Sequence, residues 1–71
     1  MPLGELLKNA RITKGMTQKQ VAEALGIQVK HYQHYEYSKR VPGPKIMIKL
    51  VKILDLDLIE IEKALESSKK V

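Results

Sequence analysis

Apolar residues recur along the chain at intervals of three and four, the spacing that places them on one side of an α-helix. The first series lies within residues 3–10, and Gly15 after it is typical of a residue that ends a helix. Thr17 and Gln20 have the spacing of a capping box, in which each side chain bonds a backbone amide at the start of a helix. They predict a second helix that ends at Gly26.

A third helix is predicted over about residues 28–36, and a basic loop over residues 38–43 follows it. Pro44 opens a fourth helix, because a proline at the first helical position removes no intrahelical hydrogen bond. Asp57 and Glu60 repeat the capping-box spacing and predict a fifth helix. The apolar sides of these last two helices comprise Met47, Leu50, Val51 and Leu54, and then Leu58, Ile61 and Leu65. The expected fold class is therefore all-α, a compact bundle of about five short helices.

Length and composition narrow the class of protein. The 71 residues form one small domain, which we place at residues 1–66, with a polar tail at residues 67–71. The absence of cysteine excludes disulfides and thiolate metal sites. The apolar stretches are far shorter than a membrane span and no secretory signal opens the sequence, so we expect a cytoplasmic protein without a membrane partner.

Charge is distributed unevenly along the chain. Residues 1–45 hold eight basic and three acidic residues, a net charge of +5, whereas residues 46–71 hold five of each. The first part is suited to a polyanion and the second to a different contact. Ordinary solvated surface would account for the charges alone equally well.

The two short helices around Gly26 have the lengths and the glycine turn of a helix-turn-helix. Ala22 is the small residue expected where these helices cross, and Ile27 is expected to hold the turn against the core. Residues 17–27 read TQKQVAEALGI and resemble the signature TQxxLAxxLGV of the lambda-repressor-like family, the Cro/XRE type of helix-turn-helix.

The resemblance covers roughly residues 3–65. Residues 39–42 read KRVP and resemble the KxxP of the family, and residues 47–56 read MIKLVKILDL and resemble its LxxLAxxLxV. It implies a DNA-binding transcriptional regulator, usually a repressor, that binds an inverted-repeat operator on double-stranded DNA as a homodimer. It implies no cofactor, and no small-molecule ligand is evident. One departure is Ser38, where the family usually has glycine; a left-handed backbone there would cost on the order of 1 kcal/mol.

The third helix has two contrasting sides. Tyr32 and Tyr35 share one side and are expected to face the core, so the opposite side, which is polar and basic, is left to face solvent or DNA. Lysine donates to guanine, glutamine pairs with adenine, and valine contacts the thymine methyl. The candidate base contacts are Val29, Lys30, Gln33 and His34. A plain solvated helix face is the alternative.

Phosphate contacts are expected at both ends of this surface. Gln18 begins the second helix, where free amides attract an anion, and the basic loop follows the third helix. The candidate phosphate contacts are Gln18, Gln28, Tyr37, Lys39 and Arg40. The resemblance implies that Arg11 and Glu36 form a structural ion pair, and a phosphate contact by Arg11 is the alternative.

Apolar residues outside the expected core stripes indicate a partner surface. These residues are Ile46, Ile48 and Ile53 on the fourth helix and Ile59 on the fifth. Residues 46–71 have no net charge to oppose the approach of a second copy. The expected homodimer interface comprises Leu56, Leu58, Ile59 and Glu62. Scattered surface hydrophobic residues are the alternative interpretation.

Two other functions compete with DNA binding. A protein-interaction module of the same fold, such as an adaptor or antitoxin-like domain, would keep the helices without specific DNA binding. An enzyme is not expected, because no nucleophile or carboxylate pair has a suitable arrangement. His31 and His34 lie three residues apart, but two histidines without a third ligand do not predict a metal site.

Overall fold

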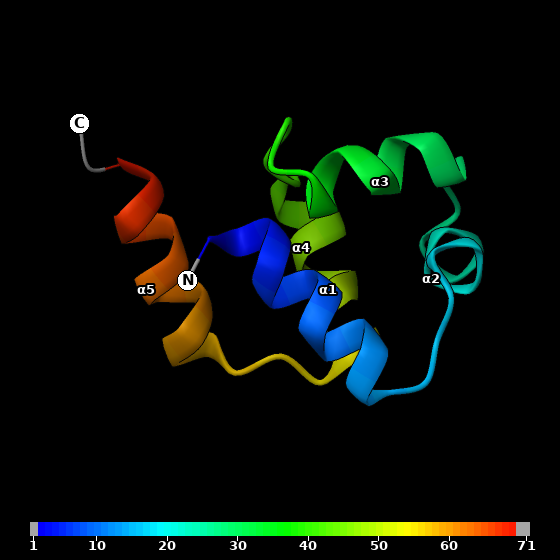
Figure 1. The fold of residues 1–71 in the computed structure, drawn as a ribbon, viewed down its shortest axis with the longest axis horizontal. Helices are drawn as coiled ribbons and strands as arrows, with labels where there is room; N and C mark the ends of the chain where they lie inside the picture. Colours follow the sequence, from blue (N-terminus) through cyan, green and yellow to red (C-terminus); the bar gives the residue numbers. More distant parts are fainter. Residues whose placement is uncertain (1, 70–71) are drawn as a thin grey trace.

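The computed structural model describes residues 2–69 and shows five α-helices with no strand among these residues. The helices are α1 (Leu3–Thr13), α2 (Gln18–Leu25), α3 (Val29–Glu36), α4 (Pro44–Leu54) and α5 (Leu58–Lys69). Figure 1 shows α1 at the centre, with α2 and α3 on one side of it and α5 on the other. The all-α prediction is confirmed.

The local signals in the sequence produce the predicted helix ends. Gly15 and Gly26 both have left-handed backbones, with φ of 69° and 74°. The Thr17 hydroxyl accepts from the Gln20 amide at 3.1 Å, and the Gln20 side chain accepts from the Thr17 amide at 2.9 Å. These bonds satisfy two of the amides that the start of a helix leaves without partners.

The core lies where α1, α2, α3 and α4 meet. Its largest fully buried side chains are Tyr32, Leu7, Leu25, Leu50 and Val21. Ala22 is also buried, and Ile27 packs against the core from the turn, as the helix-turn-helix pattern predicted. The helix-turn-helix pair is therefore held rigidly against α1 and α4.

The apolar side of α5 differs from the prediction. Leu58, expected on the core stripe, is 68% exposed, whereas Ile61 and Ala64 are buried against α1. Leu56, expected at a dimer interface, is only 8% exposed and belongs to the core of its own chain. Its backbone amide donates to the Val51 carbonyl oxygen at 3.1 Å, which holds the connection between α4 and α5 against the end of α4.

The helix also extends beyond its predicted end. No glycine or proline interrupts the chain after Glu66, and α5 continues to Lys69 through most of the segment expected to be a polar tail. Residues 70 and 71, also assigned to that tail, lie outside the described residues.

Gly4 of α1 and Ser38 after α3 meet at the end of α3, and each is constrained by its backbone. An added Cβ on Gly4 would lie 2.3 Å from the Glu36 carbonyl oxygen and 2.6 Å from Ser38 Oγ, so α1 approaches the end of α3 as closely as its backbone allows. Ser38 has a φ of 60°, in the left-handed region that glycine adopts without strain. The strain anticipated for this serine is therefore present.

Candidate nucleic-acid interface

The polar side of α3 faces away from the core. Val29 is 38% exposed and Lys30 is exposed, while Gln33 and His34 are half-buried. Tyr32 is fully buried on the opposite side, and the half-buried Tyr35 meets it edge to face with ring centroids 6.5 Å apart. Each of the four candidate base-contacting residues thus has part of its side chain exposed to solvent, where a ligand could reach it.

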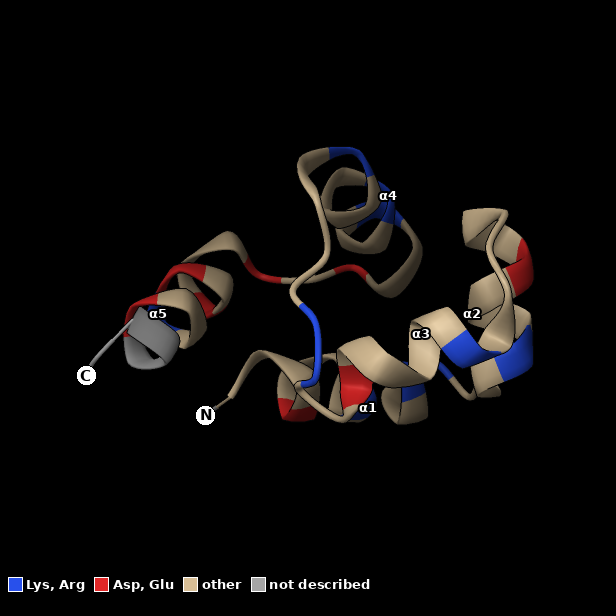
Figure 2. Ribbon diagram, turned by 90° about the horizontal axis from the view of Figure 1, so that it is seen from above, with Lys and Arg blue, Asp and Glu red and all other residues tan. Residues whose placement is uncertain are grey.

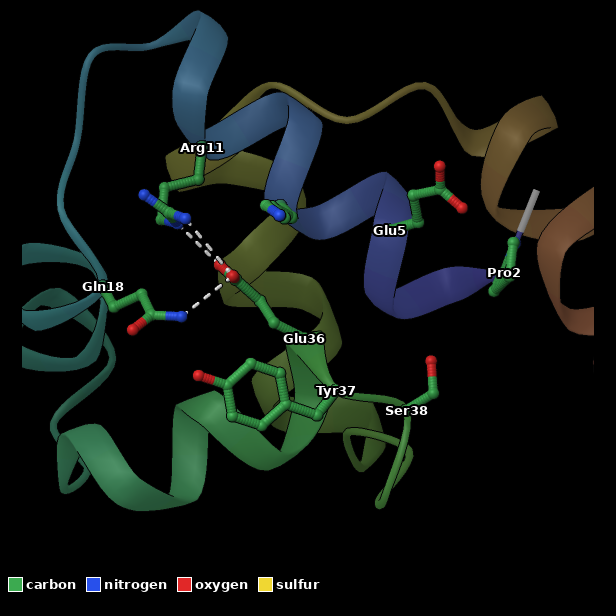
Figure 3. A pocket seen from close by; sticks show the side chains of 8 residues that line it. Pro2, Glu5, Arg11, Gln18, Glu36, Tyr37 and Ser38 are labelled. Atoms are coloured by element: carbon green, nitrogen blue, oxygen red, sulfur yellow. Dashed lines mark hydrogen bonds and ion pairs between the residues drawn. The ribbon is translucent and has the colours of Figure 1, made fainter.

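An ion pair joins α1 to the end of α3. Arg11 Nε donates to Glu36 Oε2 at 2.6 Å and Arg11 Nη2 donates to Glu36 Oε1 at 3.3 Å, so the contact is bidentate. Arg11 Nη1 also donates to the Met16 carbonyl oxygen at 2.9 Å. In Figure 3, Arg11 and Gln18 both point toward Glu36. The guanidinium is therefore engaged inside the protein, as the resemblance implied, and is not presented to a phosphate.

The environment of Glu36 keeps its carboxylate ionised. Burial alone would raise the pKa of Glu36, but the side chains of Arg11, Tyr32 and Gln18 and the charge of Arg11 outweigh it and lower the pKa. The neighbouring Tyr32 hydroxyl is buried without a hydrogen-bond partner among the described residues, and burial first and then the nearby Glu36 raise its pKa.

Acid should weaken the folded state through Glu36. The carboxyl has an ordinary pKa of about 4.5 when unfolded and a lower pKa when folded. Its contribution is therefore complete above about pH 4.5 and is lost as the pH falls through the lower folded value. We expect the free energy of unfolding to fall by up to about 1.4 kcal/mol per pH unit from this group in that window. Urea titrations between pH 6 and pH 2.5 measure how the free energy of unfolding changes with pH. If a Glu36→Gln variant showed the same dependence on pH, Glu36 would not be its source.

Gln18 has a second role that sequence reasoning missed. Its Nε2 donates to Glu36 Oε1 and its Oε1 accepts from Gln33 Nε2, both at 3.1 Å. The side chain of Gln18 is thus engaged between α2 and α3, and the second N–H of its Nε2 remains the donor for the phosphate contact that the sequence predicts. Its backbone amide and that of Lys19 occupy the first two positions of α2, where helices leave amides without intrahelical partners.

The other candidate phosphate contacts surround this surface. Tyr37 ends α3 and is 57% exposed, and Gln28 precedes α3 with an exposed side chain. Lys39 and Arg40 are exposed in the loop before α4, where both backbone amides donate to the His34 carbonyl oxygen. Figure 2 shows most basic residues on α1, α2, α3, α4 and this loop, and most acidic residues on α5 and the segment before it.

A pocket of about 400 Å³ opens between α1 and the end of α3. Figure 3 shows Gln18, Tyr37 and the Arg11–Glu36 pair along its wall, and Lys8 also contributes to the lining. Lys8 was not singled out from the sequence, because nothing in the local pattern of α1 sets it apart from other exposed lysines. Of the described residues, no three potential metal ligands lie together, and no helix is long and apolar enough to cross a membrane.

The chain is similar to proteins whose names describe transcriptional regulators. It is 43% identical over 51 residues to the SPbeta prophage-derived uncharacterized HTH-type transcriptional regulator YonR of Bacillus subtilis, covering 72% of this chain and 47% of that protein. It is 40% identical over 67 residues to the uncharacterized HTH-type transcriptional regulator YqaE of the same organism, covering 94% of this chain and 57% of that protein. The chain therefore spans about half the length of these two relatives. No solved structure matches the chain significantly.

A family comparison covers most of the fold described above. The helix-turn-helix family model matches residues 7–66, a range that runs from α1 into α5 and includes α2 and α3. The matched range contains the two helices and the glycine turn described above. The chain accordingly belongs to the Cro/XRE-type helix-turn-helix family of transcriptional regulators.

Proposed function

We propose that this protein is a sequence-specific DNA-binding regulator that places α3 in the major groove. The observation that carries the proposal is the outward, partly exposed polar side of α3 on a helix-turn-helix whose inner side is fixed by the core. Lys30 suits guanine O6 and N7, and Gln33 suits adenine. Val29 would contact a thymine methyl, and His34 would contact a guanine or a phosphate.

Phosphate contacts would orient α3 without reading sequence. The free amides at the start of α2 would bind one phosphate, since the helix dipole and unpaired N–H groups both attract an anion. The exposed Lys39 and Arg40 would bind a neighbouring phosphate from the α3–α4 loop, and Gln28 and Tyr37 would support these contacts.

The proposed assembly is a homodimer through α5. Leu58 and Ile59 are 68% and 64% exposed at the start of this helix, and Glu62 is exposed one turn further on. Leu56 is not part of this interface, because it is buried within one chain. Two copies related by a two-fold axis would place their α3 helices about one DNA turn apart, so the operator would be an inverted repeat. A dimer on such a site would act as a repressor by occluding the DNA.

The test compares one base contact with one phosphate contact on a site selected from random DNA. Lys30→Ala should lower affinity for the selected site by about 1–3 kcal/mol and relax one base position per half-site. Arg40→Ala should weaken binding to all DNA sequences. It should also reduce, by about one unit, the slope of the logarithm of the binding constant against the logarithm of the salt concentration. Fluorescence anisotropy at several salt concentrations measures both. A chain that selects no sequence and shows no salt-dependent binding would instead be a protein-interaction module.

A further inference from the structure

Two glutamines connect the proposed DNA-reading side of α3 to the buried ion pair. Gln33 Nε2 donates to Gln18 Oε1 at 3.1 Å, and Gln18 Nε2 donates to Glu36 Oε1 at 3.1 Å. We call this series of Gln33, Gln18 and Glu36 the amide relay. Arg11 holds Glu36 from the other side, so the inner end of the relay is anchored to α1 (Figure 3).

The direction of the hydrogen bonds in the amide relay follows from the chemistry of its inner end. An ionised carboxylate only accepts hydrogen bonds, so Gln18 must turn its NH₂ group toward Glu36. The Gln18 oxygen is then left for Gln33, which must turn its own NH₂ group inward. Glu36 is only 7% exposed, so water has little access to replace the bond from Gln18. Reversing either amide would place two acceptors or two donors face to face.

We propose that the amide relay determines which atoms Gln33 presents to DNA, and that Gln18 and Glu36 are therefore positioning residues for recognition of an A·T base pair. The inference rests on the proposed function. With one N–H of Gln33 held by Gln18, the amide offers its oxygen and its second N–H outward. Adenine presents the N6 donor and the N7 acceptor and matches this pair, whereas guanine presents acceptors at both O6 and N7. The Gln33 oxygen would oppose an acceptor on guanine.

A Gln18→Lys substitution reverses the direction of the relay. Lysine has only donors, so it pairs with Glu36 and donates to the Gln33 oxygen, which turns the Gln33 NH₂ group toward the DNA. We expect the ratio of affinities for adenine over guanine at the base pair read by Gln33 to fall on the order of 10-fold or more. Ala24→Lys is the matched control, because it adds the same charge at an exposed position of α2. It should leave this ratio unchanged.

A double-mutant cycle separates positioning from phosphate binding. The base pair read by Gln33 is identified as the one at which Gln33→Met abolishes preference. Gln18→Met should reduce the preference at that same base pair, and should have no further effect on it in the Gln33→Met background. A lost phosphate contact would instead weaken all sequences equally in both backgrounds.

The outcomes distinguish this inference from the function on which it rests. Specific binding with an unchanged adenine-to-guanine ratio in Gln18→Lys and Gln18→Met would overturn the amide relay alone. The relay would also be refuted, with the proposed function intact, if Gln33→Met altered no base position. Failure of the unmutated chain to bind any DNA sequence would refute the proposed function, and this inference with it.

Discussion

Ile59→Lys should convert the proposed α5 dimer to a folded monomer and weaken binding to the proposed operator on the order of 30- to 100-fold. Ile59 is 64% exposed on the outer side of α5, so a lysine there leaves the core of the chain intact. In a two-fold dimer, the substitution would place two like charges in the centre of an apolar contact. Loss of a central interface residue typically costs about 2 kcal/mol or more, which corresponds to roughly 30-fold in affinity.

Sedimentation equilibrium measures the assembly, and circular dichroism checks that the variant remains folded. Ile48→Lys is a matched control, because Ile48 is also exposed (59%) but lies on α4, outside the proposed interface. It should remain dimeric. A dimeric Ile59→Lys variant, or an unmutated chain that is monomeric both at high concentration and on DNA, would exclude the α5 assembly.

Gly4→Ala should lower the free energy of unfolding by about 3 kcal/mol, although alanine is the better helix former. Gly4 is the second residue of α1, where the change would stabilise an isolated helix by no more than about 1 kcal/mol. Here the new Cβ would lie 2.3 Å from the Glu36 carbonyl oxygen, a backbone atom that cannot move without shifting the end of α3. Overpacking of this kind costs about 1–3 kcal/mol or somewhat more. Whether Gly4→Ala lowers or raises the free energy of unfolding therefore tests how closely α1 approaches the end of α3.

Urea denaturation at one protein concentration measures this difference, since dimerisation would otherwise contribute to the apparent stability. Gly43→Ala is the control, because a Cβ at Gly43 meets no atom within 4 Å. Its effect should stay within about 1 kcal/mol. A stabilised Gly4→Ala variant would mean that α1 and the end of α3 lie further apart than described.

Local sequence signals predicted most of the fold. The capping box at Thr17 and the glycine at position 26 determine where α2 begins and ends, and both act within a few residues of themselves. On α5, Ile61 and Leu65 pack on the core as predicted, whereas the position of Leu58 was predicted wrongly for a physical reason. A helical period fits Leu58 with Ile61 as well as it fits Ile61 with Ala64, and the larger side chain is the more obvious core residue. The close packing of α5 on α1 instead favours the small Ala64.

The candidate interface was predicted less completely. The polar side of α3 follows from its periodicity, and the Arg11–Glu36 pair followed from the family resemblance. The bonds from Gln18 to Glu36 and Gln33 join residues 18 and 15 positions apart, and no local pattern encodes them. The close approach at Gly4 depends likewise on how two distant helix ends meet. A glycine inside a helix was its only signal in the sequence.

The attachment of α5 almost solely to α1 has a consequence for the dynamics of the protein. Detaching α5 breaks mainly its contact with α1, whereas α2 and α3 each pack against two other helices, so α5 costs less to release than either of them. Its amides should then exchange with solvent through a local opening that leaves the other four helices folded. Because a partner at Leu58 and Ile59 would bury more of this helix, dimer formation would slow that opening. Protein concentration would thereby govern how much of the chain is ordered.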